Sequence, residues 1–178
     1  LIELLLEAGI DEKRSSVIAA VSNGSIDRAL LLGSDDAALE RWTSWQQLRT
    51  TLDGSGNTAT AAVDRLLVMI DDAAVPLQDR QDRERKELDE RADRFGERGL
   101  GRRSLEDRHK RELRRLRTDE LVMGITAMGI SIRDDVATGL IDAALASTSL
   151  TAVTEASDDL RRNPNERLLL QKLFMNLH

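Results

Sequence analysis

Few side chains in this sequence belong to the types that most often carry catalysis or bind metals. The chain has no cysteine and two histidines, which excludes disulfides, thiolate zinc sites and cysteine nucleophiles. His109 lies in a segment rich in Lys and Arg, with no second histidine in reach, so we interpret it as part of a solvated helix face rather than as a ligand or base. His178 is the terminal residue and is a weaker candidate still.

The remaining candidates for chemistry have simple structural explanations. The segment GSGNT at 54–58 lacks the G-x-x-x-x-G-K-[ST] spacing and the lysine of a phosphate-binding loop. The carboxylate pairs at 134–135 and 158–159 are adjacent in sequence, so their side chains would diverge by about 100° on a helix. No nucleophile, base and orienting group can be placed in one site. We therefore expect no catalytic residue, no metal site and no cofactor in this chain, and no small-molecule substrate.

A basic strip stands out on a chain whose net charge is −6. Residues 98–117, called the basic strip below, contain nine Lys/Arg and three acidic residues. Such cations could contact nucleic-acid phosphates, but no aromatic side chain is interleaved with them for base stacking. A solvated or partner-facing helix is favoured, with nucleic-acid binding as the alternative. The candidate contact residues are Arg102, Arg103, Arg108, Lys110, Arg111, Arg114, Arg115 and Arg117.

The pattern of the chain predicts helices throughout. Aromatic residues make up 2% of the sequence, and no run shows the period-two alternation of a strand. Trp42 and Trp45 share a helical face with Leu39 and are predicted to be core. Start and stop signals predict helices that begin at the serine pair 15–16, at Ser25 and after Ser34, and further helices over about 58–75, 76–95, 104–135, 132–147, 149–162 and 164–177.

Two of these predicted helices form a charged hairpin, at about 76–120. We expect Pro76 to separate its first helix from the one before it, and the capping-box pattern that begins at Ser104 to open the second. No stretch of about 18 or more apolar residues could span a membrane, and a chain without cysteine fits the cytoplasm. The sequence begins inside an amphipathic pattern without an initiator methionine, so we expect it to be part of a longer protein.

The terminal segment, NPNERLLLQKLFMNL at 163–177, is the most apolar predicted helix. Asn163 is its expected N-cap and Pro164 its first residue. Its large apolar side chains spread around more than half of the helix, which predicts burial on several sides, in the centre of a bundle or between subunits. The candidate subunit-interface residues are Leu168, Leu169, Leu170, Leu173, Phe174 and Leu177.

Three segments resemble one known family in the expected order. The terminal segment resembles the closing helix of bacterial clamp-loader collar domains. The segment SVIAAVSNGSIDRALLL at 16–32 is similar to the end of a AAA+ lid, with Arg28 at the sensor-2 position, and LVMGITAMGISIRDDV at 121–136 is similar to a collar helix that ends in Arg-Asp, here Arg133 and Asp134. The charged hairpin resembles that of delta-prime clamp-loader subunits of actinobacterial DNA polymerase III.

This resemblance implies an architecture and a function. Residues 1–33 would be the end of a AAA+ lid, and residues 34–178 a collar-type helical bundle for oligomerisation that carries the charged hairpin. The chain would be a non-catalytic assembly module whose partners are other clamp-loader subunits, of the gamma/tau and delta types. The whole complex would act on the sliding clamp and primed DNA, with ATP bound elsewhere.

Overall fold

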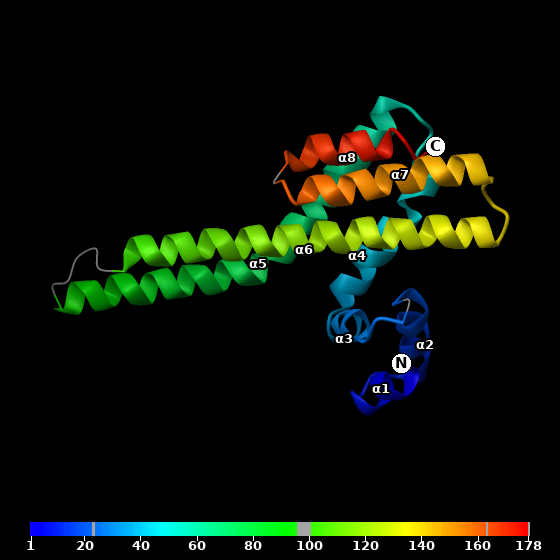
Figure 1. Cartoon of the computed structure of the whole chain (residues 1–178). Coiled ribbons are helices and arrows are strands. Elements are labelled where there is room, and N and C mark those ends of the chain that lie inside the picture. Colours follow the sequence, from blue (N-terminus) through cyan, green and yellow to red (C-terminus); the bar gives the residue numbers. More distant parts are fainter. Residues whose placement is uncertain (23, 96–100, 163, 178) are drawn as a thin grey trace. The chain divides into compact units, whose positions relative to one another are not determined.

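In a computed structural model, residues 1–22, 24–95, 101–162 and 164–177 are described, and they contain helices and no strand. The predicted all-α class is confirmed. No helix in these ranges is both long and apolar enough to cross a membrane. Along the chain (Figure 1) the elements are α1 Ile2–Glu7, α2 Glu12–Val21, α3 Ile26–Ser34, α4 Asp36–Gln47, the 3-10 helix η1 Leu48–Thr51, α5 Gly56–Phe95, α6 Arg102–Ala137, α7 Ala143–Leu160 and α8 Glu166–Phe174.

Side-chain caps decide where the early helices begin. Ser25 accepts a hydrogen bond from the backbone of the third residue of α3 and caps that helix as predicted. The predictions for α2 and α4 were wrong, because Asp11 caps α2 four residues before the predicted serine and Asp35 caps α4 one residue after it. A carboxylate at this position accepts the same backbone hydrogen bond and also complements the positive end of the helix dipole.

Pro76 does not end a helix. The prediction of two helices that meet at Pro76 was wrong, because α5 is a single helix of 40 residues with this proline inside it. A proline in a helix interior removes one backbone hydrogen bond and crowds the preceding turn. Ion pairs to α6 on both sides of Pro76, from Asp71 to Arg117 and from Arg80 to Glu112, hold the two parts of α5 against one continuous partner. Pairs as exposed as these contribute at most about 1 kcal/mol each, so they reduce the penalty of about 3 kcal/mol without cancelling it.

The later helix boundaries also differ from the predicted ones. Ser104 lies inside the first turn of α6 rather than at its cap, and α6 continues to Ala137 without a break near 132. The chain then turns with Gly139 at a φ of 73°, and Asp142 caps α7 by accepting from the backbone of Leu145 at 2.8 Å. The predicted helices at 132–147 and 149–162 are therefore the end of α6, a turn, and one helix.

Asn165 caps α8 by accepting from the backbone of Leu168 at 3.1 Å. The predicted cap, Asn163, lies outside the described residues, and Pro164 precedes the helix rather than opening it. The shift shortens the helix by two residues at its start. It leaves the predicted apolar positions from Leu168 to Phe174 within the helix.

The chain divides into two compact units. Unit 1 contains residues 1–64 and 122–178, and unit 2 contains residues 65–121. Residues 1–33, predicted as a separate lid segment, belong to the same compact unit as residues 34–64. In unit 2, α5 and α6 run side by side as an antiparallel hairpin (Figure 1), which confirms the predicted hairpin.

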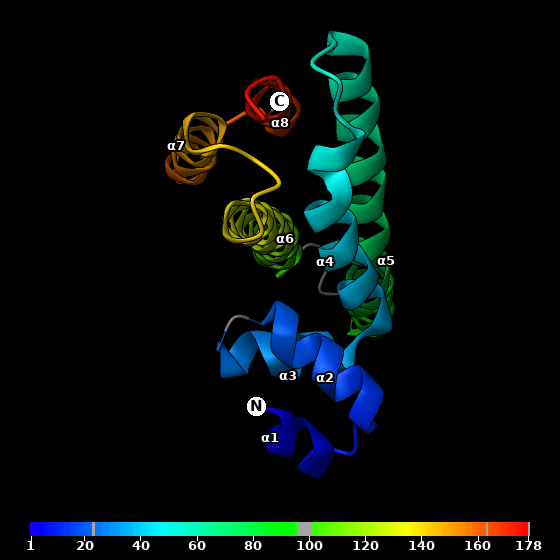
Figure 2. The ribbon, with the colours of Figure 1, turned by 90° about the vertical axis from the view of Figure 1, so that its right-hand side faces the viewer.

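The core of unit 1 includes large aromatic side chains of α4 and α8. Trp42 and Trp45 of α4 are 0% and 1% exposed, so the prediction that they are core is confirmed. The ring of Trp45 meets the ring of Phe174 edge-on, with centroids 6.3 Å apart. Gly124 of α6 lies directly under Trp45, since a β-carbon there would be 2.0 Å from the indole. Figure 2 shows α7 and α8 next to one another in the same unit.

Candidate functional site

The last helix, α8, has one buried apolar face and two exposed apolar side chains on the opposite side. Leu169, Leu170, Leu173, Phe174 and Leu177 are at most 5% exposed, so unit 1 itself buries five of the six residues predicted as a subunit interface. The sixth, Leu168, is the exception, at 63% exposed, and Met175 on the same side is 42% exposed. These two exposed side chains form the outward stripe of α8.

Polar contacts on both flanks hold α8 in place within unit 1. Gln171 donates to the hydroxyl of Thr60 at 3.4 Å, and Arg167 pairs with Asp64 at 2.5 Å. Both partners lie in the first turns of α5. These contacts fix the rotation of α8 about its axis, which keeps Leu168 and Met175 on the outside.

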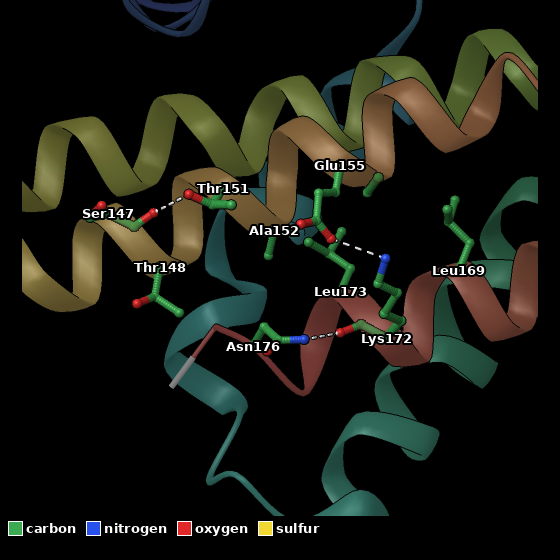
Figure 3. Close-up of a pocket in the computed structure, with 10 residues that line it drawn as sticks. Ser147, Thr148, Thr151, Ala152, Glu155, Leu169, Lys172, Leu173 and Asn176 are labelled. Atoms are coloured by element: carbon green, nitrogen blue, oxygen red, sulfur yellow. Dashed lines mark hydrogen bonds and ion pairs between the residues drawn. The ribbon is translucent and has the colours of Figure 1, made fainter.

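On its other flank, α8 faces α7 across a cavity of about 410 Å³ (Figure 3). The ammonium of Lys172 lies 3.0 Å from Glu155 and 3.6 Å from Asp159. The bond to Glu155 is the main cause that raises the pKa of Lys172 above its usual range. Lys172 therefore stays protonated and acts as a strut between the two helices. The cavity is lined by Ser147, Thr148, Thr151, Ala152, Glu155, Ala156, Leu169, Lys172, Leu173 and Asn176.

Arg28, which the resemblance would place at the sensor-2 position, makes its contacts within unit 1. Its guanidinium carbon lies 4.9 Å from the centre of the Trp42 ring, and one nitrogen donates to the carbonyl of Ser22 at 3.2 Å. Burial lowers the pKa of Arg28 from its usual value. A cation stacked on an indole and bonded to a helix end is well placed to fasten α2 and α3 to α4.

Two polar side chains are buried inside the hairpin of unit 2. His109 is 4% exposed and Gln81 is 3% exposed. The interpretation of His109 as part of a solvated helix face was wrong, because its Nε2 lies 3.0 Å from a carboxylate oxygen of Glu84. The amide of Gln81 donates to the backbone carbonyl of His109 at 3.2 Å and to Glu112 at 3.0 Å. These groups form the polar centre of the α5–α6 contact.

Two arginines complete this polar centre. Arg80 donates to Glu112 at 2.8 Å, and Arg108 donates to Glu84. The hydrogen bond from His109 is the largest cause that lowers the pKa of Glu84, and the bond from Gln81 is the largest that lowers the pKa of Glu112. Both carboxylates are therefore ionised near neutral pH and serve as anchors between the helices rather than as proton donors.

The hairpin separates the cations of the basic strip into two groups. Arg108 and Arg117 pair with acids of α5, and Arg102 pairs with Asp89 of α5 at 3.7 Å. Arg115 lies 3.7 Å from Asp119 but is 85% exposed. Among the described residues of the basic strip, the other cations are exposed and form no ion pair with any described residue: Arg103, Lys110, Arg111 and Arg114. Arg98 lies outside the described residues.

The described residues contain no group of three or more His, Asp or Glu side chains that could hold a metal ion. Two sets of exposed side chains stand out among the described residues. One is the outward stripe of α8 in unit 1, and the other is the unpaired set of cations in unit 2. No family model matches the chain, and no curated protein or solved structure is detectably similar to it.

Proposed function

We propose that the chain is a non-catalytic assembly module of a bacterial clamp loader, of the delta-prime type, and that its partners are gamma/tau and delta-type subunits. The three segments that resemble this family occupy α2 and α3, the second half of α6, and α8. All three segments lie mainly in helices, as the lid and the collar of this family would require. In the assembled loader the module would hold subunits together while the complex acts on the sliding clamp at primed DNA.

The outward stripe of α8 carries this proposal. Leu168 and Met175 are seven residues apart, which places them on one side of the helix two turns from each other. A helix whose other side is sealed by Leu170 and Phe174 can offer these two side chains without exposing its own core. Exposed apolar residues on a rigid helix are suited to pack against a helix of a neighbouring subunit.

The exposed pair Arg133 and Asp134 provides a second point of support. These residues match the Arg-Asp that ends the resembling collar helix. Their side chains form an ion pair with each other at 3.0 Å and are 55% and 59% exposed. Neither is needed to fill the core of unit 1. Their exposure leaves the charges accessible to a partner at the end of α6.

The test is to replace Leu168 and Met175 with Glu and measure binding of the 178-residue chain to purified gamma/tau and delta-type subunits. Burial of each apolar side chain contributes about 1.5–3 kcal/mol, so the double variant should bind at least about 100-fold more weakly. Point variants are preferable to removal of the terminal helix, because that truncation would strip five buried side chains from unit 1 and unfold it.

The matched control replaces Val136 and Leu140 with Glu. These residues are 41% and 72% exposed and also lie in unit 1, so the control adds the same charge at similar exposure on another part of the surface. It should bind like the unchanged chain, and both variants should keep its helical circular dichroism. If the α8 variant assembles normally, or if the control weakens binding as much, the proposed interface is wrong.

A further inference from the structure

The unpaired cations of α6 lie on one side of the hairpin. Arg103, Lys110 and Arg114 fall within about 40° of one another on a helix with 3.6 residues per turn, and Arg111 lies about 60° beyond Arg114. The opposite side of α6 is the one that faces α5, where His109 is buried. The four residues, called the cationic face below, extend over about 16 Å of the helix at about 1.5 Å per residue.

Acidic residues of the hairpin cancel only part of the charge of this face. Asp107 is the one acid among the described residues of α6 that falls within the cationic face. The hairpin as a whole, residues 77–120, has 15 basic and 13 acidic residues, whereas the chain has a net charge of −6. The negative potential of the acidic rest of the chain is screened beyond about 10 Å at 0.1 M salt. The local excess of positive charge therefore dominates at the surface of α6.

The surroundings of the cationic face favour one class of partner. Among the described residues 77–94 and 101–120, no large apolar side chain is exposed. These residues of the hairpin therefore offer a protein partner none of the exposed apolar or aromatic anchors that form the centre of most protein interfaces. The same residues offer a single-stranded nucleic acid no exposed aromatic side chain on which its bases could stack. A duplex backbone needs neither, because unpaired cations alone provide affinity for it.

We propose that the cationic face binds the phosphate backbone of a nucleic-acid duplex without reading its sequence. Each strand of B-DNA carries about one charge per 3.4 Å of axis, so a helix segment of about 16 Å spans about five phosphates. Four cations can neutralise up to four of these. The face lies entirely within unit 2, so this proposal stands or fails independently of the α8 interface.

The experiment measures binding of the 178-residue chain to a labelled DNA duplex of about 30 base pairs by fluorescence anisotropy, as a function of salt. Four phosphate contacts predict a slope of log affinity against log salt near −3.6, and hence a loss of about 150-fold between about 50 and 200 mM salt. A variant with Gln in place of each of the four cations should lose at least tenfold in affinity at about 50 mM salt, and most of the slope. The substitutions are Arg103→Gln, Lys110→Gln, Arg111→Gln and Arg114→Gln.

A matched variant removes the same charge from the other helix of the hairpin. The variant replaces four arginines of α5 that are exposed, lie among acidic residues and form no ion pair with described residues: Arg65, Arg83, Arg91 and Arg94. Their replacement by Gln should change duplex affinity less than threefold. Both variants should keep the helical circular dichroism of the unchanged chain, since Gln is a good helix former.

Four results would overturn the proposal. One is no binding of the duplex by the unchanged chain at about 50 mM salt. Another is an equal loss of affinity in the α5 variant, which would show attraction to overall charge rather than to this face. The third is tighter binding of a single strand of the same length, and the fourth is displacement of the duplex by poly-glutamate at equal charge concentration. The last result would instead indicate an acidic protein partner.

Discussion

Replacement of Gly124 by Ala tests how tightly the core of unit 1 is packed. In a helix interior this change normally stabilises a protein by about 1 kcal/mol, because glycine is a poor helix former. Here a β-carbon would lie 2.0 Å from Cε2 and 2.2 Å from Cδ2 of Trp45. Both atoms belong to a rigid ring that is 1% exposed and packed edge-on against Phe174, so the ring must move as a unit.

The two effects can be compared in magnitude. Overpacking of a core costs about 1–3 kcal/mol, and contacts this short inside a fused ring place the penalty at about 3 kcal/mol. After the helix-propensity gain, Gly124→Ala should destabilise the protein by about 2 kcal/mol. For a chain of this length, that corresponds to a melting temperature lower by about 4–8 °C.

The assay is urea unfolding followed by tryptophan fluorescence. Both tryptophans belong to unit 1, so the signal reports on the unit that contains Gly124. The matched control is Gly129→Ala in the same helix, where the nearest atom, a methyl carbon of Val153, is 3.4 Å away. The control should stabilise the protein by up to about 1 kcal/mol.

An unchanged or higher urea midpoint for Gly124→Ala would refute the packing argument. A double-mutant cycle with Trp45→Leu gives a second check. If the indole causes the penalty, Gly124→Ala should cost less by about 1 kcal/mol or more when the chain already carries the Trp45→Leu substitution. Trp42 then remains as the fluorescent reporter.

Two further predictions concern polar contacts of unit 1. The hydroxyl of Thr58 is the main cause that lowers the pKa of Asp53 to about 2, so Thr58→Val should raise this pKa toward its usual value in a carboxyl NMR titration; the stability that the bond provides is present above pH about 4 and is lost as pH falls toward 2. The Arg49–Asp135 pair is 15% and 17% exposed, so Asp135→Asn should destabilise unit 1 by about 1–3 kcal/mol, less than for a fully buried pair. Urea unfolding measures the loss of stability in this variant and in the double variant Arg49→Met/Asp135→Leu. A smaller loss in the double variant would show that the unpaired guanidinium causes the loss in Asp135→Asn, and an equal or larger loss would contradict it.

The features of the fold that depend on local pattern could be predicted from the sequence. The absence of period-two alternation indicates the all-α class, and the density of charges at i,i+3 and i,i+4 spacing indicates the hairpin. The helical spacing of Trp42 and Trp45 indicates a core face. Each of these signals is repeated over several residues, so a single exception does not change the outcome.

The features that depend on tertiary contacts could not be predicted in the same way. Pro76 is a strong local stop signal, but α5 continues through it and pairs with α6 on both sides, through Asp71–Arg117 and Arg80–Glu112. His109 resembles its charged neighbours in the sequence, and only the position of Glu84 and Gln81 on the facing helix shows that it is buried. The residues next to His109 in the sequence do not reveal which side chains of the facing helix cover it.

The α8 helix shows how the same limit affects the candidate interface. The buried positions 169, 170, 173, 174 and 177 follow the i, i+1, i+4, i+5, i+8 spacing of one broad face. A count of leucines therefore overestimates the surface available to partners. The two outward residues could contribute about 3–6 kcal/mol if buried, which is comparable to or below the estimated 4–15 kcal/mol that association costs. Leu168 and Met175 can thus add specificity to a larger interface, but they cannot hold a complex together alone. If the chain is an assembly module, its stable incorporation requires further contacts, and the exposed pair Arg133 and Asp134 at the end of α6 is one candidate for them.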